Sequence, residues 1–158
     1  LEKMLEMALQ TRLPVILHCR DAYHDLFPIL MNFYGNRSPV RRFHGVIHCF
    51  SGTIQEAEQG VALGFALGID GPITYPKNHA LRAAATKVGI QVLLLETDSP
   101  YLPVQIARGT RNEPKFIPNI AGELAVNLNL SVGEVASITT KNAHDLFVKQ
   151  PEQEFNNK

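Results

Sequence analysis

Two short phrases in the sequence are nearly identical, and each contains a histidine followed by a cysteine at the end of an apolar run. They are PVILHC at 14–19 and GVIHCF at 45–50, in a chain with six histidines and two cysteines. A third apolar run, VLLLETD at 92–98, ends on a carboxylate. Imidazole and carboxylate ligands suit a hydrolytic Zn²⁺, Mn²⁺ or Mg²⁺ site better than a soft thiolate site. The candidate metal ligands are therefore His18, His48 and Asp98.

The elements that would bring these side chains together are buried strands. Four apolar runs, each followed by a helical pattern, predict β-strands at 15–19, 45–50, 65–70 and 92–98. Strands and helices in alternation favour a parallel sheet with right-handed crossovers. Functional groups in such folds lie at the carboxyl ends of the strands, so the predicted site lies at one edge of the sheet.

Helix-start signals place the helices around this sheet. Apolar residues at helical spacing predict a first helix over 1–12, and Asp21 is predicted to cap the second. The predicted start signals of three further helices are Thr53 with Glu56, Asn78, and Ser131 with Glu134. A Pro-rich loop over 99–118 then leads to helices at about 120–128 and from 132 onward.

The composition favours one α/β domain over 1–150 with a frayed tail at 151–158. A chain of 158 residues with 45% hydrophobic content is long enough for one hydrophobic core. Fifteen basic residues balance fifteen acidic ones, so any nucleic-acid contact must come from a local patch. The sequence shows neither a signal-peptide pattern nor an apolar run near 18 residues, which predicts a cytoplasmic protein without a membrane partner, with a nuclear location also open.

The main alternative chemistry is a structural zinc site made of the two His-Cys pairs. Neighbouring residues on a strand point to opposite faces, so a His and the Cys after it are not expected to hold one ion. We predict that Cys19 and Cys49 pack outward under the helices as buried, inert thiols. Ser51, in CFSG, lacks the G-x-S-x-G pattern of a serine hydrolase.

Other residues could support a metal site. Glu96 lies two residues before Asp98, on the same strand face, and is predicted to act as a supporting or additional carboxylate. The loop RGTRNEPK follows the same strand with a cluster of cations suited to phosphate contact, namely Arg108, Arg111 and Lys115. Structural roles stay open for each residue alone, since a strand-end His is often only hydrogen-bonded and Asp98 could brace the Ser-Pro turn.

An ordered set of phrases resembles the TatD family of metal-dependent deoxyribonucleases. The phrases are LPVILHCRDA, GVIHCFSG, GIDGPIT, LLLETDSPYL, RGTRNEP and NAHDLF. The resemblance implies a TIM-type (β/α)₈ barrel of the amidohydrolase-like group, with two divalent ions that support DNA phosphodiester hydrolysis, often as a 3′ to 5′ exonuclease. By the same resemblance, His18, His48 and Asp98 are metal ligands, Asp98 is also the catalytic group that activates water, and the basic loop seats the DNA, as a single strand or a 3′ end.

The chain departs from this family pattern in one large respect. It has no His-x-His pair and no Glu within a GEIGLD phrase, both of which the family places in the first four strands. A complete barrel needs about 250 residues, so we expect a partial TIM-type barrel in which the four strands correspond to strands five to eight. One weak metal site at most is expected in this half-barrel, with little or no activity alone.

Open sheet edges in a half-barrel favour self-association or pairing with a missing N-terminal half. Two alternatives stay open. One is a non-catalytic half-barrel module that assembles with a partner, and the other is a metal-dependent hydrolase of another bond type.

Overall fold

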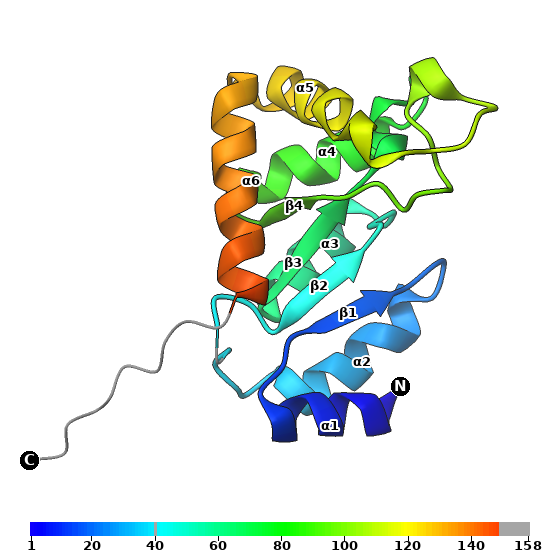
Figure 1. The fold of residues 1–158 in the computed structure, drawn as a ribbon. Helices are drawn as coiled ribbons and strands as arrows, with labels where there is room; N and C mark the ends of the chain where they lie inside the picture. The colour runs from blue at the N-terminus through cyan, green and yellow to red at the C-terminus, as the bar shows by residue number, and fades with distance from the viewer. Residues whose placement is uncertain (40, 149–158) are drawn as a thin grey trace, which may run out of the picture.

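A computed structural model describes residues 1–39 and 41–148 (Figure 1). The predicted frayed tail at 151–158 lies outside the described residues. The helices are α1 (Glu2–Thr11), α2 (Tyr23–Tyr34), α3 (Ile54–Ala62), α4 (His79–Val88), α5 (Ile117–Leu128) and α6 (Val132–Phe147). The strands are β1 (Val15–His18), β2 (Gly45–His48), β3 (Phe65–Ile69) and β4 (Leu93–Leu95). Short 3₁₀ helices cover Gly71–Thr74, Ile90–Val92, Gln105–Ala107 and Pro114–Phe116.

The four strands form one parallel sheet in the order β1-β2-β3-β4, which confirms the predicted α/β class and parallel sheet. His18 and His48 are partners in the register of β1 and β2, so both reach the same edge of the sheet. The last strand is shorter than predicted, because Ile90–Val92 is 3₁₀ and the strand ends at Leu95. Its final ladder contact is the Glu96 amide donating to the Ile69 carbonyl, where the neighbouring strand β3 also ends.

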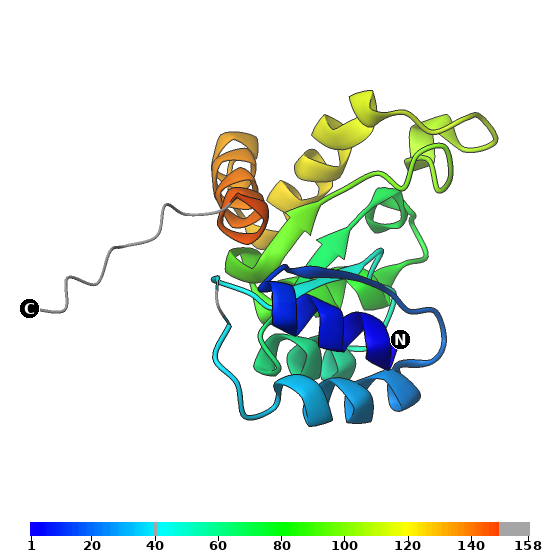
Figure 2. The same ribbon diagram turned by 60° about the horizontal axis from the view of Figure 1, so that its bottom comes forward.

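Alternation along the strands gives the sheet two different faces. One face carries a row of four buried residues in register, Leu17, Ile47, Leu67 and Leu93, which pack into the main core with the helices. Figures 1 and 2 show α2 and α3 side by side against the sheet. The other face has a smaller cluster, composed of Phe43, Val46, Ala66, Leu94 and Leu146. His48 and Gly68 lie two residues after Val46 and Ala66 on this second face, and His18 pairs with His48, so it is the face that presents the candidate site.

The predicted helix starts hold for three helices. Thr53 and Ser131 each form a capping box with the Glu three residues later, and the Asn78 side chain accepts a hydrogen bond from the Leu81 amide. Because each signal satisfies backbone amides that the first turn leaves free, it needs no tertiary contact to act.

The predicted cap at Asp21 is wrong. Helix α2 begins at Tyr23 after Ala22, which makes no side-chain cap, and Asp21 has a φ of 54° with its side chain pointing into solvent. Helix α5 begins at Ile117, three residues earlier than predicted, because Pro118 fits within a first helical turn. Among the described residues, no helix is both long and apolar enough to cross a membrane.

Candidate active site

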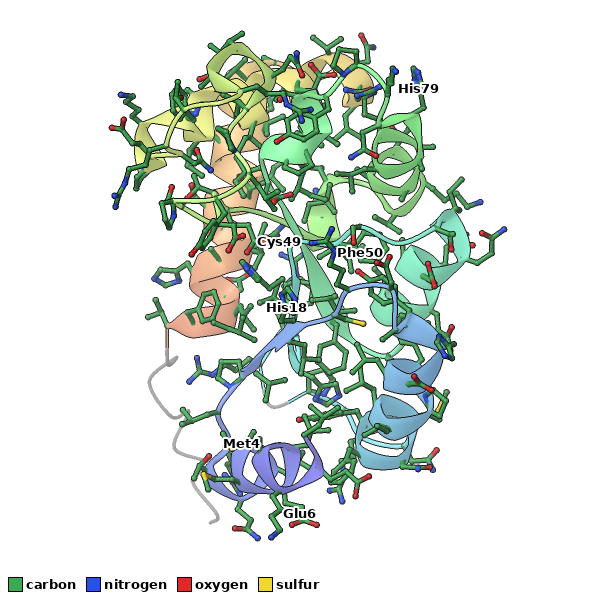
Figure 3. All side chains as sticks on the ribbon, turned by 90° about the vertical axis from the view of Figure 1, so that its right-hand side faces the viewer. Met4, Glu6, His18, Cys49, Phe50 and His79 are labelled. Carbon is green, nitrogen blue, oxygen red and sulfur yellow. The ribbon has the colours of Figure 1, made fainter. Side chains whose placement is uncertain are left out.

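The carboxyl ends of the strands bring a histidine and several carboxylates together. His18 ends β1 and His48 ends β2, while Asp70 directly follows β3 and Glu96 follows β4. Figure 3 shows His18 and Cys49 at the ends of neighbouring strands. This meeting point follows from the parallel topology, since all four strands end at one edge.

His48 is held between two carboxylates. Its Nδ1 lies 2.9 Å from Glu96 Oε2, and its Nε2 lies 3.2 Å from Asp98 Oδ1. Burial alone would lower the pKa of His48, but hydrogen bonds and charge attraction from Glu96 and then Asp98 outweigh it and raise the pKa above its ordinary value. In this arrangement, two anionic groups converge on one imidazole.

Glu96 occupies a space that only a glycine leaves open. Its Oε1 accepts a hydrogen bond from the Cys49 amide, so the carboxylate spans the ends of β2 and β4. A Cβ atom placed on Gly68 of β3 would lie 2.2 Å from Glu96 Oε1. The missing side chain at Gly68 is therefore what allows the carboxylate to lie across the sheet.

The prediction that Cys49 packs outward under the helices is wrong. The strand ends at His48, and Cys49 takes a left-handed backbone conformation with a φ of 47°, so its side chain does not continue the alternation. Its Sγ lies 3.3 Å from His48 Nε2, on the site side and not under the helices. Burial, with the Asp70 carboxylate next in size, raises the pKa of the Cys49 thiol far above its ordinary value. In the absence of a metal ion the thiol is therefore protonated.

The prediction for Cys19 is confirmed. This residue is buried in the main core, and burial raises the pKa of its thiol. Its position directly after the end of β1 matches that of Cys49 after β2, so the difference between the two thiols comes from backbone conformation.

Asp70 is a site residue that the sequence analysis missed. Its side chain is 1% exposed, and among the described residues its Oδ2 has no hydrogen-bond partner. Burial raises the pKa of Asp70 to about 7, and the nearby Glu96 and Asp98 carboxylates add to the effect. The available signal was its place at the end of a predicted strand, the same rule that selected His18 and His48.

His18 faces the site from the edge strand. Its ring centroid lies 6.2 Å from that of His48, with the two rings tilted by 46°. The side chain is exposed, unlike the half-buried side chain of His48. The structure thus joins His48, Glu96 and Asp98 directly and places His18 beside them.

A buried asparagine holds the loop that carries Asp98. Asn112 is 2% exposed, and its Nδ2 lies 2.6 Å from both the Thr97 and the Tyr101 carbonyl oxygens. These bonds tie the chain on either side of Asp98, which has a φ of 55°. Asn112 carries no signal in the sequence, because its partners are backbone atoms that no side-chain pattern reports.

The three cations of the following loop lie in different surroundings. Lys115 forms an ion pair with Glu113 at 2.9 Å, which offsets its charge. The Arg108 guanidinium lies 4.4 Å from the centre of the Tyr75 ring, while Arg111 is exposed on the same loop.

The donor set fits a divalent cation. One ligand atom from each of His48, Cys49 and Glu96 lies within 4.8 Å of the others. The Glu96 carboxylate beside Gly68, and Asp70 Oδ2, which has no hydrogen-bond partner within residues 1–39 and 41–148, are oxygen atoms with which a cation would pair. The imidazole nitrogen and the carboxylate oxygens are donors that Zn²⁺, Mn²⁺ and Mg²⁺ sites use.

Comparison with known proteins places the chain in a family. A family model described as TatD related DNase matches residues 1–148. The chain is 33% identical over 143 residues to the uncharacterized metal-dependent hydrolase YabD of Bacillus subtilis, a match covering 90% of this chain and 54% of that protein. It is 36% identical over 150 residues to a protein named 3'-5' ssDNA/RNA exonuclease TatD from Yersinia pseudotuberculosis, covering 90% of this chain and 55% of that one.

A solved structure of a TatD homolog also matches the chain. The crystal structure of YjjV, a TatD homolog from Escherichia coli, matches with a TM-score of 0.85 at 33% identity, covering 95% of this chain and 56% of that chain. The chain thus spans about half the length of the relatives it matches. Because the family model spans all but the last ten residues, the chain belongs to the TatD related DNase family, whose members include metal-dependent hydrolases.

Proposed function

We propose that this chain carries part of a divalent-metal-dependent active site that hydrolyses phosphodiester bonds in single-stranded nucleic acid. The observation that carries the proposal is the contact of His48 with both Glu96 and Asp98 at the carboxyl end of a parallel sheet. The family and the name of the Yersinia relative support the choice of substrate.

The residues proposed to hold the ion are His18, His48 and Asp98, with Glu96 as a positioning carboxylate. An ion bound there would polarise a phosphoryl oxygen and lower the pKa of a coordinated water. Asp98 would accept the proton of the attacking water, while Glu96 would fix the orientation of His48 through Nδ1. The water oxygen then forms a new bond to phosphorus, and the bond from phosphorus to the leaving oxygen breaks.

The half-length match to the relatives is the reason for treating the site as partial. We propose that the four strands correspond to strands five to eight of a (β/α)₈ barrel, and that the chain binds one divalent ion weakly. Full activity would then need a second set of ligands, from another copy of this chain or from an N-terminal half. A non-catalytic half-barrel that only assembles with a partner is the second candidate, favoured by the exposed Ile16 side chain on β1, which is the first strand of the described sheet.

The test combines metal binding with nucleotide release. We expect calorimetry to detect Mn²⁺ binding, and a labelled single-stranded oligonucleotide to be shortened slowly in Mg²⁺ or Mn²⁺. A His48→Ala, Asp98→Ala double variant should lose both signals. Its matched control is a His24→Ala, Asp25→Ala double variant. His24 Nε2 lies 3.3 Å from Asp25 Oδ2, so this is also a His–Asp pair, but it is exposed on α2.

Each outcome separates the candidates. Nucleotide release that survives in the His48→Ala, Asp98→Ala variant would show that the site is assigned wrongly. Mn²⁺ binding that depends on His48 and Asp98, without any nucleotide release, would support the non-catalytic half-barrel instead.

A further inference from the structure

A second feature of the same sheet edge is a groove between the loops that follow β3 and β4. It has a volume of about 520 Å³ and is lined by Tyr75, Pro76, Lys77, Asn78, Gln105 and Arg108. The site residues Asp70 and Asp98 lie near the starts of these two loops, and the Ile73 amide, two residues before Tyr75, donates to the Asp70 carbonyl at 3.1 Å. The groove therefore lies at the same carboxyl end of the sheet as the candidate active site.

The two loops are tied to each other. The Tyr75 hydroxyl donates to the Pro103 carbonyl at 2.8 Å, and the Gln105 amide donates to Thr74 Oγ1 at 2.8 Å. Gly71 approaches the Leu102 carbonyl so closely that a Cβ there would lie 2.1 Å from the oxygen. The groove thus exists before any ligand binds, which lowers the entropy cost of binding.

A further arginine stiffens the first of these loops. Arg82 of α4 donates from Nη1 to the Ile73 and Tyr75 carbonyls at 2.9 and 2.7 Å, and from Nη2 to the Pro76 carbonyl at 2.8 Å. The backbone is therefore anchored both before and after Tyr75 along the chain.

The chemistry of the groove suits a nucleotide. The Arg108 guanidinium is stacked over the Tyr75 ring at 4.4 Å, and the Arg108 side chain is exposed, so its outer face is open. A planar cation in this position is a platform on which a base can stack. Lys77 is exposed in the same groove, and the six lining residues include two cations and no carboxylate.

We infer that this groove binds one nucleotide of a single strand, with its base stacked on Arg108 and its phosphate beside Lys77. The inference rests on the proposed function, since it adds a base-binding subsite next to the phosphodiester site. It also changes the expected role of Arg108, which would act through its plane as well as its charge.

The test is binding of a dye-labelled hexathymidylate in EDTA, followed by fluorescence anisotropy, so that metal is not needed. A set of the same oligonucleotides carries an abasic site at one position each. Base stacking is worth about 1 to 3 kcal/mol, so one abasic position should weaken binding by roughly 5- to 150-fold. The Arg108→Lys variant keeps the charge but lacks the plane, and we expect it to bind all oligonucleotides in the set alike.

Two further variants complete the design. Tyr75→Phe keeps the ring and should keep the base dependence, whereas Tyr75→Leu should lose it. The matched control is Arg12→Lys, which alters an exposed arginine on the α1 side and should behave as the wild type.

The results separate this inference from the proposed function. If the wild type binds the intact and all the abasic oligonucleotides equally strongly, or if the Arg108→Lys variant keeps the base dependence, the subsite is overturned. The proposal of hydrolysis is then unaffected. A base-dependent signal without metal-dependent nucleotide release supports the subsite and contradicts hydrolysis. A wild type that binds no oligonucleotide in EDTA overturns the subsite, and nucleotide release in Mg²⁺ or Mn²⁺ then decides on hydrolysis separately.

Discussion

At the scale of single residues, strand ends predicted the site better than side-chain alternation did. His48 and Asp98 are predicted metal ligands because each ends an apolar run, and in the structure His48 Nε2 lies 3.2 Å from Asp98 Oδ1. Asp70 obeys the same rule, since it is the last residue of the predicted strand 65–70, but it is absent from the predicted ligands. Cys49 lies on the unexpected side because its positive φ breaks the alternation, and a single sequence does not report a backbone angle of that kind.

Gly68 gives a residue-scale prediction about metal binding. In Gly68→Ala the new Cβ would meet Glu96 Oε1 at 2.2 Å, and the carboxylate would have to leave His48. Loss of such a supporting contact typically weakens metal binding about 10- to 100-fold, so calorimetry with Mn²⁺ should show a drop of that order. The control is Gly122→Ala on α5, where a Cβ meets nothing within 4 Å. Equal Mn²⁺ affinity in the two variants would remove Glu96 from the site.

Asp70 gives a second residue-scale prediction, about pH. Its folded pKa, about 7, lies above the ordinary value of 3.8, so ionisation opposes folding. Stability is therefore highest below the ordinary pKa, falls as pH rises toward 7, and stays low above it. The full penalty is about 4 kcal/mol at 1.36 kcal/mol per pKa unit.

The measurement is urea unfolding in EDTA between about pH 5 and pH 8, because a bound cation would favour the ionised form. Asp70→Asn should gain stability over the wild type by an amount that grows with pH. Asp25→Asn, an exposed carboxylate on α2, should show no such trend. A difference between Asp70→Asn and wild type that stays constant across this range would contradict the assignment.

At the scale of elements, local signals predicted the helices and tertiary contacts set the rest. The capping residues at Thr53, Asn78 and Ser131 act within one turn, so the sequence alone was enough to place them. The length of β4 depends on its neighbour, since its ladder stops where β3 stops. The loop after Asp98 depends on Asn112, whose partners are carbonyls ten or more residues away.

Asn112 gives the prediction for that loop. In Asn112→Ala the Thr97 and Tyr101 carbonyls lose their donor inside the protein. Leaving buried acceptors unpaired costs about 1 to 3 kcal/mol, which urea unfolding should detect, and Mn²⁺ affinity should fall because Asp98 is no longer fixed. Asn119→Ala, an exposed position on α5, is the control and should change neither quantity. An Asn112→Ala variant with wild-type stability and affinity would mean that the loop is held by other contacts.

At the scale of the whole molecule, the main feature is the edge strand β1, which begins the strand order of the described sheet. Strand β1 pairs only with β2 within the described sheet, so its outer backbone groups are free to pair. Ile16 on this edge strand is 64% exposed, and Leu13 just before it is 58% exposed. Relatives of about twice this length match the chain over roughly half of their own residues.

The last prediction follows from this edge. An apolar edge strand is a template for pairing, so we expect the purified chain to form dimers or larger species in size-exclusion chromatography with light scattering. Ile16→Lys places a charge on the exposed edge and should shift the population to monomer. Val126→Lys is the matched control, since Val126 is 80% exposed on α5, away from the edge, and should leave the oligomeric state unchanged. A compact, stable wild-type monomer would contradict pairing through β1 and would mean that this sheet is stable without a second copy of the chain.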